Sequence, residues 1–434
     1  MWLRGRAFGS HPKGPWFKSK HEHKMFKIVA KNTIYQIISK VFTAGGALVG
    51  TILITRFFGA KTFGDYSIVM AYVLSFYLIS DLGINAITVK EFSQDEKLIK
   101  RNFSSILLLR IVIGILLVIL CNLVLFLVPY QIYIKQAIRI GSLLIFFQAI
   151  YTTCNIVFQA KLNYKRVAVI SFIGSTLSVL ILIPVVLLGS SLHLLILAVA
   201  AGYLLYPIFS LFNLRRYINL SRESINYRYW FMVIALSLPI GISLILNSFM
   251  VSADRLILSF MVDSISVGLY SLAYKIFELV LVVPTFFMNA MYPLMVRYNG
   301  NSPKDFNKSV KTSIKTLTLV ALMLTAVTLI TSKFLITTIW GIEMQKAFVP
   351  FNILMAGSIF FFLSSPLSWV LVVKNKQRVL PVIYGLALIF NVILNIIFIP
   401  RYNYLASAVV TVLTEFLVLS ALFIFVRRLP QSQS

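Results

Sequence analysis

The run IVIGILLVILCNLVLFLVPYQIYI, residues 111–134, contains no charged side chain and is the clearest indication of the fold class. A helix rises about 1.5 Å per residue, so this run is long enough to cross the roughly 30 Å hydrocarbon core of a bilayer. Similar runs recur along the 434 residues, of which 59% are hydrophobic and only 12% charged. Soluble proteins carry about 25% charged residues. The sequence therefore predicts an all-α integral membrane protein.

Twelve membrane spans are predicted from these runs and from the turns between them. The run 167–214 is too long for one span, and it divides at Gly189–His193, where Gly and Ser indicate a turn. The predicted spans are 33–57, 66–89, 104–129, 137–160, 167–188, 193–214, 230–258, 265–295, 314–339, 348–372, 380–399 and 404–426.

Basic residues indicate how the chain is oriented. The formal net charge of +27 would suggest a nucleic-acid-binding protein if the charge were evenly spread. Instead, Lys and Arg cluster at the amino terminus and in alternate loops, such as Lys161–Arg166 and Lys374–Arg378. Cytoplasmic loops of membrane proteins carry such an excess. We therefore predict that both termini lie in the cytoplasm.

Two passages recur in equivalent loops of a six-plus-six arrangement. Arg56–Ser67 and Phe260–Ser271 both end in Gly-x-Tyr-Ser, while Asn163–Val167 and Asn375–Val379 share Asn-x-x-Arg-Val. We expect the Gly to relax the start of the next helix and the Tyr to lie at headgroup level. Repeats of the same orientation predict two six-helix bundles with a substrate site between them, which rock to give alternating access.

The predicted domain organisation follows from this repeat. The first segment is basic and lacks the apolar core of a signal peptide, so we expect a disordered extension there. The predicted units are the extension 1–24, an amino-terminal bundle 25–214, a cytoplasmic linker 215–229, a carboxy-terminal bundle 230–428 and a tail 429–434.

Several ionisable residues fall within predicted spans, where a charge costs about 2.5–3.5 kcal/mol and suggests a function by default. The basic ones are Lys40, Arg110, Arg255 and Lys275, and the acidic ones are Asp81, Asp254, Glu278 and Glu415. If some carboxylates are paired elsewhere, a cavity between the bundles would be net positive. The four basic side chains would then bind an anion such as pyrophosphate, and the four carboxylates are candidates for ion coupling. An acidic cavity would instead favour organic cations.

Structural explanations compete with these roles. Lys275 and Glu278 are three residues apart on one helix face and can neutralise each other. Lys40 and Arg110 are close enough to the inner surface to extend toward it. Asp81 and Glu415 have no cation near them in sequence, so they either pair across helices, with Lys40 or Lys275, or titrate.

The sequence lacks the usual signs of an enzyme. It has no Gly-x-x-x-x-Gly-Lys-Ser/Thr nucleotide motif, no loop large enough for a catalytic domain and no cluster with metal-ligand spacing. His21 and His23 lie in the basic extension without further ligands. We therefore predict a transporter that carries no metal or organic cofactor.

The order and spacing of several motifs resemble the polysaccharide-repeat flippases, the Wzx-type exporters of the multidrug/oligosaccharidyl-lipid/polysaccharide (MOP) superfamily. The similarity covers residues 25–428, with one departure at Leu405–Ala408, where the family often has Gly-Ala-Ala. The motifs are Lys31-Asn-Thr-Ile, Phe58–Ser67, Ser80–Asn85, Ala253–Leu256, Gly268–Lys275 and Asn395–Tyr402.

This resemblance implies two six-helix bundles around a central cavity, as in the MATE transporters of that superfamily. It also implies translocation of an undecaprenyl-pyrophosphate-linked oligosaccharide, such as an O-antigen or capsule unit, across the bacterial inner membrane. Coupling to protons or sodium is compatible with it. The expected partners are the lipid-linked substrate, membrane lipids, a polysaccharide polymerase and glycosyltransferases, but not nucleic acid.

Two other functions stay open. One is a multidrug or cation antiporter of the same superfamily, for which Asp81 is the candidate acidic site in the first bundle. The other is a membrane scaffold for glycan assembly that transports nothing, although a scaffold gains nothing from the insertion cost of buried charges.

Overall fold

The computed structural model describes residues 15–215, 217–218, 225–299 and 302–428, and all regular secondary structure in those ranges is helical. The α-helices are α1 (Pro15–Ser80), α2 (Ile84–Gln94), α3 (Lys97–Val124), α4 (Ile132–Gly141), α5 (Leu143–Ala160), α6 (Tyr164–Leu187), α7 (Leu192–Leu214), α8 (Tyr227–Met261), α9 (Ser264–Val280), α10 (Val282–Tyr298), α11 (Pro303–Trp340), α12 (Phe348–Ala356), α13 (Ser358–Val373), α14 (Leu380–Tyr402) and α15 (Tyr404–Arg427). Two short 3-10 helices are η2 (Ile342–Ala347) and η3 (Gln377–Val379).

The predicted extension and tail are largely outside the part of the chain that the structure describes. Residues 1–14 and the tail 429–434 lie outside it, as do the side chains of His21 and His23. Helix α1 begins at Pro15, so the helix starts within the segment predicted to be disordered.

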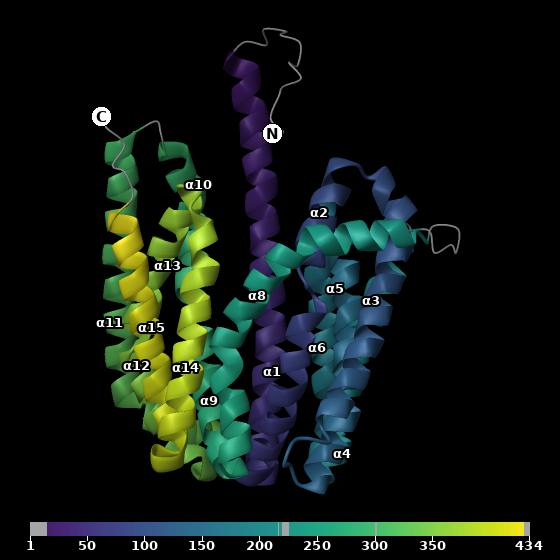
Figure 1. The fold of residues 1–434 in the computed structure, drawn as a ribbon, viewed down its shortest axis with the longest axis vertical. Helices are drawn as coiled ribbons and strands as arrows, with labels where there is room; N and C mark the ends of the chain where they lie inside the picture. Colours follow the sequence, from purple (N-terminus) through teal and green to yellow (C-terminus); the bar gives the residue numbers. More distant parts are fainter. Residues whose placement is uncertain (1–14, 216, 219–224, 300–301, 429–434) are drawn as a thin grey trace.

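Helix α1 consists of two arms joined at a kink. Helical geometry is interrupted at Gly59, whose φ of 75° and ψ of −176° favour glycine over other residues. The apolar part of α1, Ile34–Ser80, has 47 residues. A straight helix of that length would be about 70 Å long, more than twice the hydrocarbon thickness. Because the chain turns back at Gly59, the two arms of α1 lie side by side (Figure 1) and supply the predicted span 33–57 and the first part of the predicted span 66–89, which is interrupted after Ser80.

The number of spans depends on how α1 is counted. By length and composition, the described residues contain ten helices able to cross a membrane, or eleven if the bent pair Ile342–Ala356 and Ser358–Val373 is one span. Counting the two arms of α1 separately would supply the remaining predicted span. The all-α membrane fold is thus confirmed, while the exact count of twelve stays a prediction.

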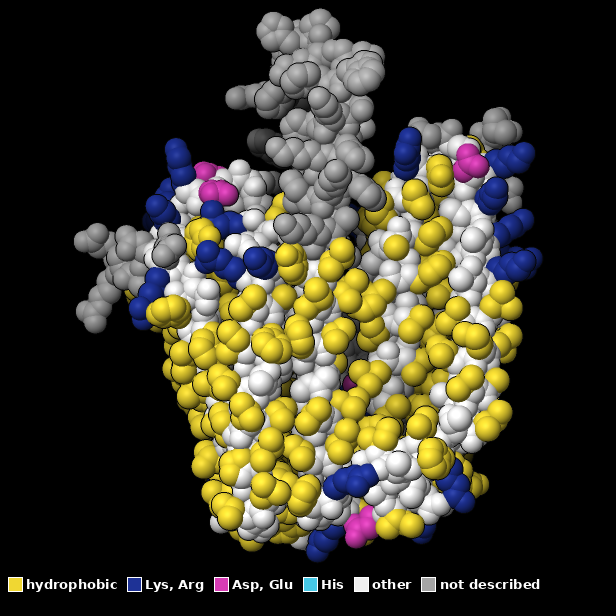
Figure 2. Space-filling view, turned by 180° about the vertical axis from the view of Figure 1, so that it is seen from behind, with side chains coloured by type: hydrophobic (Ala, Val, Ile, Leu, Met, Phe, Trp, Pro, Cys, Tyr) yellow, Lys and Arg dark blue, Asp and Glu magenta, His cyan; other side chains and the backbone are white. Residues whose placement is uncertain are grey.

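The helices form two halves. The first half comprises α1–α7, the second comprises α9–α15, and α8 crosses between them (Figure 1). The start of α1 and the end of α15 lie at the same end of the molecule, which we call the terminal end. Figure 2 shows hydrophobic side chains around the middle of the molecule and Lys and Arg gathered toward the terminal end. This distribution suits a lipid-facing belt, and the cytoplasmic position of the terminal end stays a prediction from the loop charges.

Helix α8 packs on both halves, against α1 and α2 of the first and α14 of the second. Near its start, Trp230 donates a 2.9 Å hydrogen bond from Nε1 to the carbonyl oxygen of Ser105 in the first half. Further along, Gly241 lies so close to Leu82 that a Cβ would be 2.3 Å from the Leu82 carbonyl carbon. Helix α8 begins just inside the predicted cytoplasmic linker and first contacts the opposite half.

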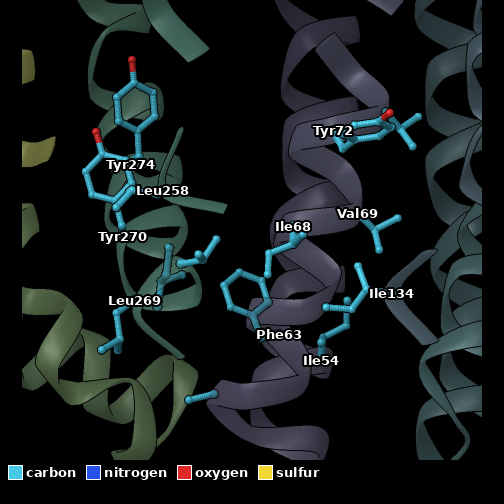
Figure 3. Close-up of a cluster of buried hydrophobic side chains, with 14 of the residues drawn as sticks. Ile54, Phe63, Ile68, Val69, Tyr72, Ile134, Leu258, Leu269, Tyr270 and Tyr274 are labelled. Carbon is cyan, nitrogen blue, oxygen red and sulfur yellow. The ribbon is translucent and has the colours of Figure 1, made fainter. Parts of the chain in front are cut away.

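A hydrophobic cluster joins the halves near the Gly59 kink (Figure 3). Phe63 and Ile68 of α1 lie in it with Leu258 of α8 and Leu269 of α9, and each of the four is at most 3% exposed. Dense packing of this kind stabilises the contact through many small dispersion interactions. The halves are therefore held together at this end, which we call the closed end.

Candidate functional site

A cavity of 1060 Å³ lies between the two halves. Helices α1, α5, α6 and α7 line it from the first half, and α8 and α9 line it from the second. It extends from Gln36 and Lys40 in the first arm of α1 to Ile54 and Phe63 near the closed end. Figure 2 shows a dark furrow between the halves on one face. The volume is at the upper limit of the roughly 300–1,000 Å³ of small-molecule pockets, so the cavity suits a large ligand.

Three of the four predicted basic residues line this cavity. They are Lys40, Arg255 and Lys275, and they are accompanied by one of the predicted carboxylates, Glu278. Arg255 forms an ion pair with Glu278 at 3.2 Å, and its guanidinium lies 4.7 Å from the ring centroid of Tyr274. The predicted pairing of Lys275 with Glu278 is therefore not formed, because Arg255 of the neighbouring helix α8 pairs with Glu278 instead. Among the described residues, neither Lys40 nor Lys275 has an ion-pair partner.

Arg110 lies away from the cavity and is fully buried. It forms an ion pair with Asp81 and donates 2.6 Å hydrogen bonds to the carbonyl oxygen of Ser80 and to Oδ1 of Asn85. These partners surround the break between α1 and α2. The expectation that Arg110 extends to the surface is wrong, because a nearby carboxylate compensates its charge inside the protein. Asp81 pairs with Arg110 rather than with Lys40 or Lys275.

Asp254 of α8 and Glu415 of α15 are buried and do not line the cavity. Asp254 accepts hydrogen bonds from the hydroxyls of Tyr270 and Thr411, the latter at 3.1 Å. Glu415 accepts one from Ser364. Hydroxyl donors therefore offset part of the cost of burying these carboxylates.

The first half lines the cavity with neutral polar side chains that the search for charged residues missed. Gln148, Tyr151, Asn155 and Gln159 of α5 all contact the cavity. Steps of three, four and four residues place them on one helix face. This polar stripe in an otherwise apolar segment was the available sequence signal. The cavity therefore has a neutral wall formed by α5 and a charged wall formed by α8 and α9, and Lys40 of α1 adds a further cation from the first half.

At the closed end the halves touch backbone to backbone. A Cβ at Gly64 would lie 1.7 Å from the carbonyl oxygen of Ser264, and one at Gly268 would lie 3.0 Å from the carbonyl oxygen of Ala60. Gly64 and Gly268 are the equivalent glycines of the internal repeat. Neither has a positive φ, so the expectation that they relax a helix start is wrong. Their role in the structure is to let the two halves approach closely.

Two capping interactions flank this contact. Arg56 Nε donates to the carbonyl oxygen of Ile339 at 2.9 Å, close to the carboxyl end of α11. The backbone nitrogen of Ala60 donates to Glu343 Oε2 at 2.9 Å, at the start of the second arm of α1. A cation near a helix carboxyl end and an anion near an amino end are both favourable. Each half thus caps a helix of the other.

Other repeat positions have diverged. Ser67 and Ser271 both line the cavity, as does Tyr66, but Tyr270 is fully buried and donates to Asp254. The predicted headgroup position is therefore wrong for Tyr270, because a buried carboxylate accepts its hydroxyl.

Asp263 lies in the turn between α8 and α9, outside the membrane-spanning segments. It accepts hydrogen bonds from the backbone nitrogen of Ser266 at 3.0 Å and from the Ser266 hydroxyl at 2.8 Å. Burial raises the pKa of Asp263, but these hydrogen bonds outweigh burial and hold the pKa below its ordinary value.

Solved structures share this fold. A lipid II flippase MurJ in an inward closed conformation has a TM-score of 0.74 at 15% identity, covering 91% of this chain and 87% of that one. An inward-facing multidrug resistance MATE transporter of the MOP superfamily has a TM-score of 0.72 at 11% identity, covering 91% and 97%. An outward-facing MATE transporter has a TM-score of 0.62 at 13% identity, covering 92% and 94%. All three likenesses concern the fold.

Sequence comparisons place the chain in a family. No curated protein matches it. The MatE family model matches residues 239–397, across the second half. The model for polysaccharide biosynthesis proteins matches residues 29–299, more than half of the chain. The protein therefore belongs to the polysaccharide biosynthesis protein family, within the MOP superfamily of membrane transporters and flippases.

Proposed function

We propose that this protein flips an undecaprenyl-pyrophosphate-linked oligosaccharide repeat unit, of O-antigen, capsule or exopolysaccharide, across the bacterial inner membrane. The observation that carries the proposal is the charge of the cavity. Among its described lining residues, Lys40, Arg255 and Lys275 are basic and only Glu278 is acidic. An excess of positive charge inside a cavity suits a pyrophosphate.

The cavity would give a polar headgroup a route that avoids hydrocarbon. Each polar group moved into an apolar medium without a partner costs about 2–7 kcal/mol. In this proposal the sugar and pyrophosphate cross inside the cavity while the polyprenyl chain stays in lipid. Opening of the closed end, together with approach of the halves at the terminal end, would complete alternating access. The terminal end faces the cytoplasm in this mechanism.

The charged residues take different roles. Lys40 and Lys275 provide unpaired charge for the pyrophosphate, while Glu278 and Tyr274 hold Arg255 in position beside them. Arg110, paired with Asp81, stabilises the break between α1 and α2 instead of contacting the substrate. Coupling to protons or sodium through Asp81, Asp254, Glu278 or Glu415 stays a prediction, as do polymerase and glycosyltransferase partners.

The alternative functions fit less well. A cation antiporter needs an acidic site in the cavity, yet Asp81 is paired with Arg110, and the described lining residues of the first half include no carboxylate. A scaffold that transports nothing has no use for a charged cavity of this size.

A flipping assay in proteoliposomes tests the proposal. The lipid-linked oligosaccharide is incorporated in one leaflet, and its appearance in the other is measured by accessibility to a sugar-cleaving enzyme. Replacing Lys40→Gln and Lys275→Gln together should lower the rate about tenfold or more, because each charge-assisted hydrogen bond is worth about 1.5–3 kcal/mol.

The matched control is Lys90→Gln with Lys308→Gln, one exposed lysine from each half. This pair removes the same net charge outside the cavity and should leave the rate unchanged. Equal rates for the two double variants, with both proteins folded, would overturn the binding role of the cavity lysines.

A further inference from the structure

The neutral wall of the cavity is built like a sugar-binding surface. Gln148, Asn155 and Gln159 present amide groups, each able to donate and accept hydrogen bonds. Tyr151 lies among them and presents an apolar ring face with a polar hydroxyl. Neutral sugars have the same mixture, with hydroxyl groups around the edge and apolar C–H faces, and they carry no charge that would need Lys or Arg.

One group on this wall lacks a partner. The Oδ1 atom of Asn155 is buried and has no hydrogen-bond partner among the described residues. Leaving a buried acceptor unsatisfied costs about 1–3 kcal/mol, so such atoms call for an explanation. Asn155 lines the cavity, and a ligand hydroxyl there would satisfy it.

The tyrosine rings on this wall are held in place by each other. The Tyr151 and Tyr206 ring centroids are 5.2 Å apart in an edge-to-face arrangement, and Tyr203 lies 6.1 Å from Tyr206. Gly174 lets Tyr206 pack closely, since a Cβ there would lie 2.7 Å from the ring. Rings fixed before binding lose little entropy when a ligand arrives.

The length of the stripe suits a ligand of more than one sugar. From Gln148 to Gln159 the helix rises about 16 Å. The opposite wall carries Arg255 and Lys275, which suit a pyrophosphate. A pyrophosphate-linked oligosaccharide has these two kinds of chemistry at its two ends.

We propose that the α5 stripe Gln148, Tyr151, Asn155 and Gln159 binds the oligosaccharide of the substrate while the charged wall binds its pyrophosphate. This assignment rests on the proposed function. The substrate then lies across the cavity in one orientation, with its sugars against the first half. Opposite walls of the cavity therefore bind two different parts of one substrate molecule.

The test compares two ligands on the full-length protein in lipid nanodiscs. One is undecaprenyl pyrophosphate without sugar, and the other is the same carrier bearing an oligosaccharide. The triple variant Gln148→Leu, Asn155→Leu and Gln159→Leu keeps side-chain size while removing the amides. It should weaken binding of the sugar-bearing carrier about 10- to 100-fold and leave the bare carrier within about twofold. Lys275→Gln should weaken both ligands.

Thr152→Val provides the matched control. Thr152 is on the same helix but does not line the cavity, and its hydroxyl donates to the Gln148 carbonyl oxygen at 3.0 Å. It should bind both carriers like the unmodified protein. The sugar assignment would be overturned if the triple variant weakened binding of both carriers equally, or if it weakened binding of neither. If the unmodified protein bound neither carrier, the proposed function itself would fail, which is a separate outcome.

Discussion

Adding one methyl group at Gly64 should keep the two halves apart at the closed end. The Cβ of Gly64→Ala would lie 1.7 Å from the Ser264 carbonyl oxygen, whereas ordinary contact begins at 3.4 Å. The halves must therefore move apart by well over an ångström at this point. Overpacking of this kind costs about 1–3 kcal/mol, and the cost arises only in the conformation in which the halves touch. The equilibrium between touching and separated halves should therefore shift about 5- to 150-fold toward the separated conformation.

Spin-label distance measurements can detect this shift. Ile132 in the first half and Ile342 in the second are 67% and 74% exposed, so cysteines placed there would label readily. The native Cys121 and Cys154 are buried and should not interfere. In Gly64→Ala a longer distance between the labels should gain population at the expense of the short one.

A graded series of variants makes the test strict. Gly268→Ala should have a smaller effect than Gly64→Ala, because its nearest contacts are at 3.0 Å. Gly45→Ala should have none, because nothing lies within 4 Å of a Cβ there. If Gly64→Ala gave the same distances and the same flipping rate as Gly45→Ala, the glycine contact would not control the closed end.

Further predictions concern charge. Arg110→Gln leaves Asp81 without its cation and should cost about 3–5 kcal/mol of stability, partly restored by adding Asp81→Asn, as thermal unfolding of the purified protein would reveal. Glu343→Gln should weaken the cap on Ala60 by about 0.3–1 kcal/mol and raise the open population only slightly in the spin-label assay. Asp263→Ala should destabilise the protein by about 1 kcal/mol near neutral pH. Because the folded pKa of Asp263 is lowered, its stabilisation is present above the ordinary aspartate pKa of about 3.9 and is lost as pH falls through the lowered value. Unfolding curves of protein and variant should therefore converge in acid.

Composition and charge pattern were enough to predict the membrane fold, because the constraint of the bilayer acts on every span. The kink of α1 at Gly59 lies between the predicted spans 33–57 and 66–89, since Phe58–Ser67 contains glycines and charge between apolar runs, whereas the break after Ser80 was not predicted. The membrane fold could therefore be predicted from the properties of one sequence segment at a time.

Charge pairing could not be predicted in the same way, because it depends on neighbouring helices. Spacing along α9 favoured Lys275 with Glu278, but α8 brings Arg255 to that carboxylate instead. Arg110 and Asp81 belong to different helices and meet only where α1 breaks. Pairs three or four residues apart on a helix gain only about 0.2–0.5 kcal/mol, so a better partner across the interface easily wins.

The internal repeat explains why the cavity has two unlike walls. Counted from Gly64 and Gly268, the positions equivalent to Lys275 and Glu278 are Ala71 and Leu74. All four of these residues line the cavity, so the duplicated backbone is preserved, while at these equivalent positions only the second half carries charge. Two identical walls would bind a substrate with unlike ends equally well in either direction. Divergence of the repeat removes that ambiguity, because only one direction places phosphate against the charged wall and sugar against the neutral one. The equivalent glycines stayed the same because the closing contact, unlike the binding surface, needs the same close approach from both halves.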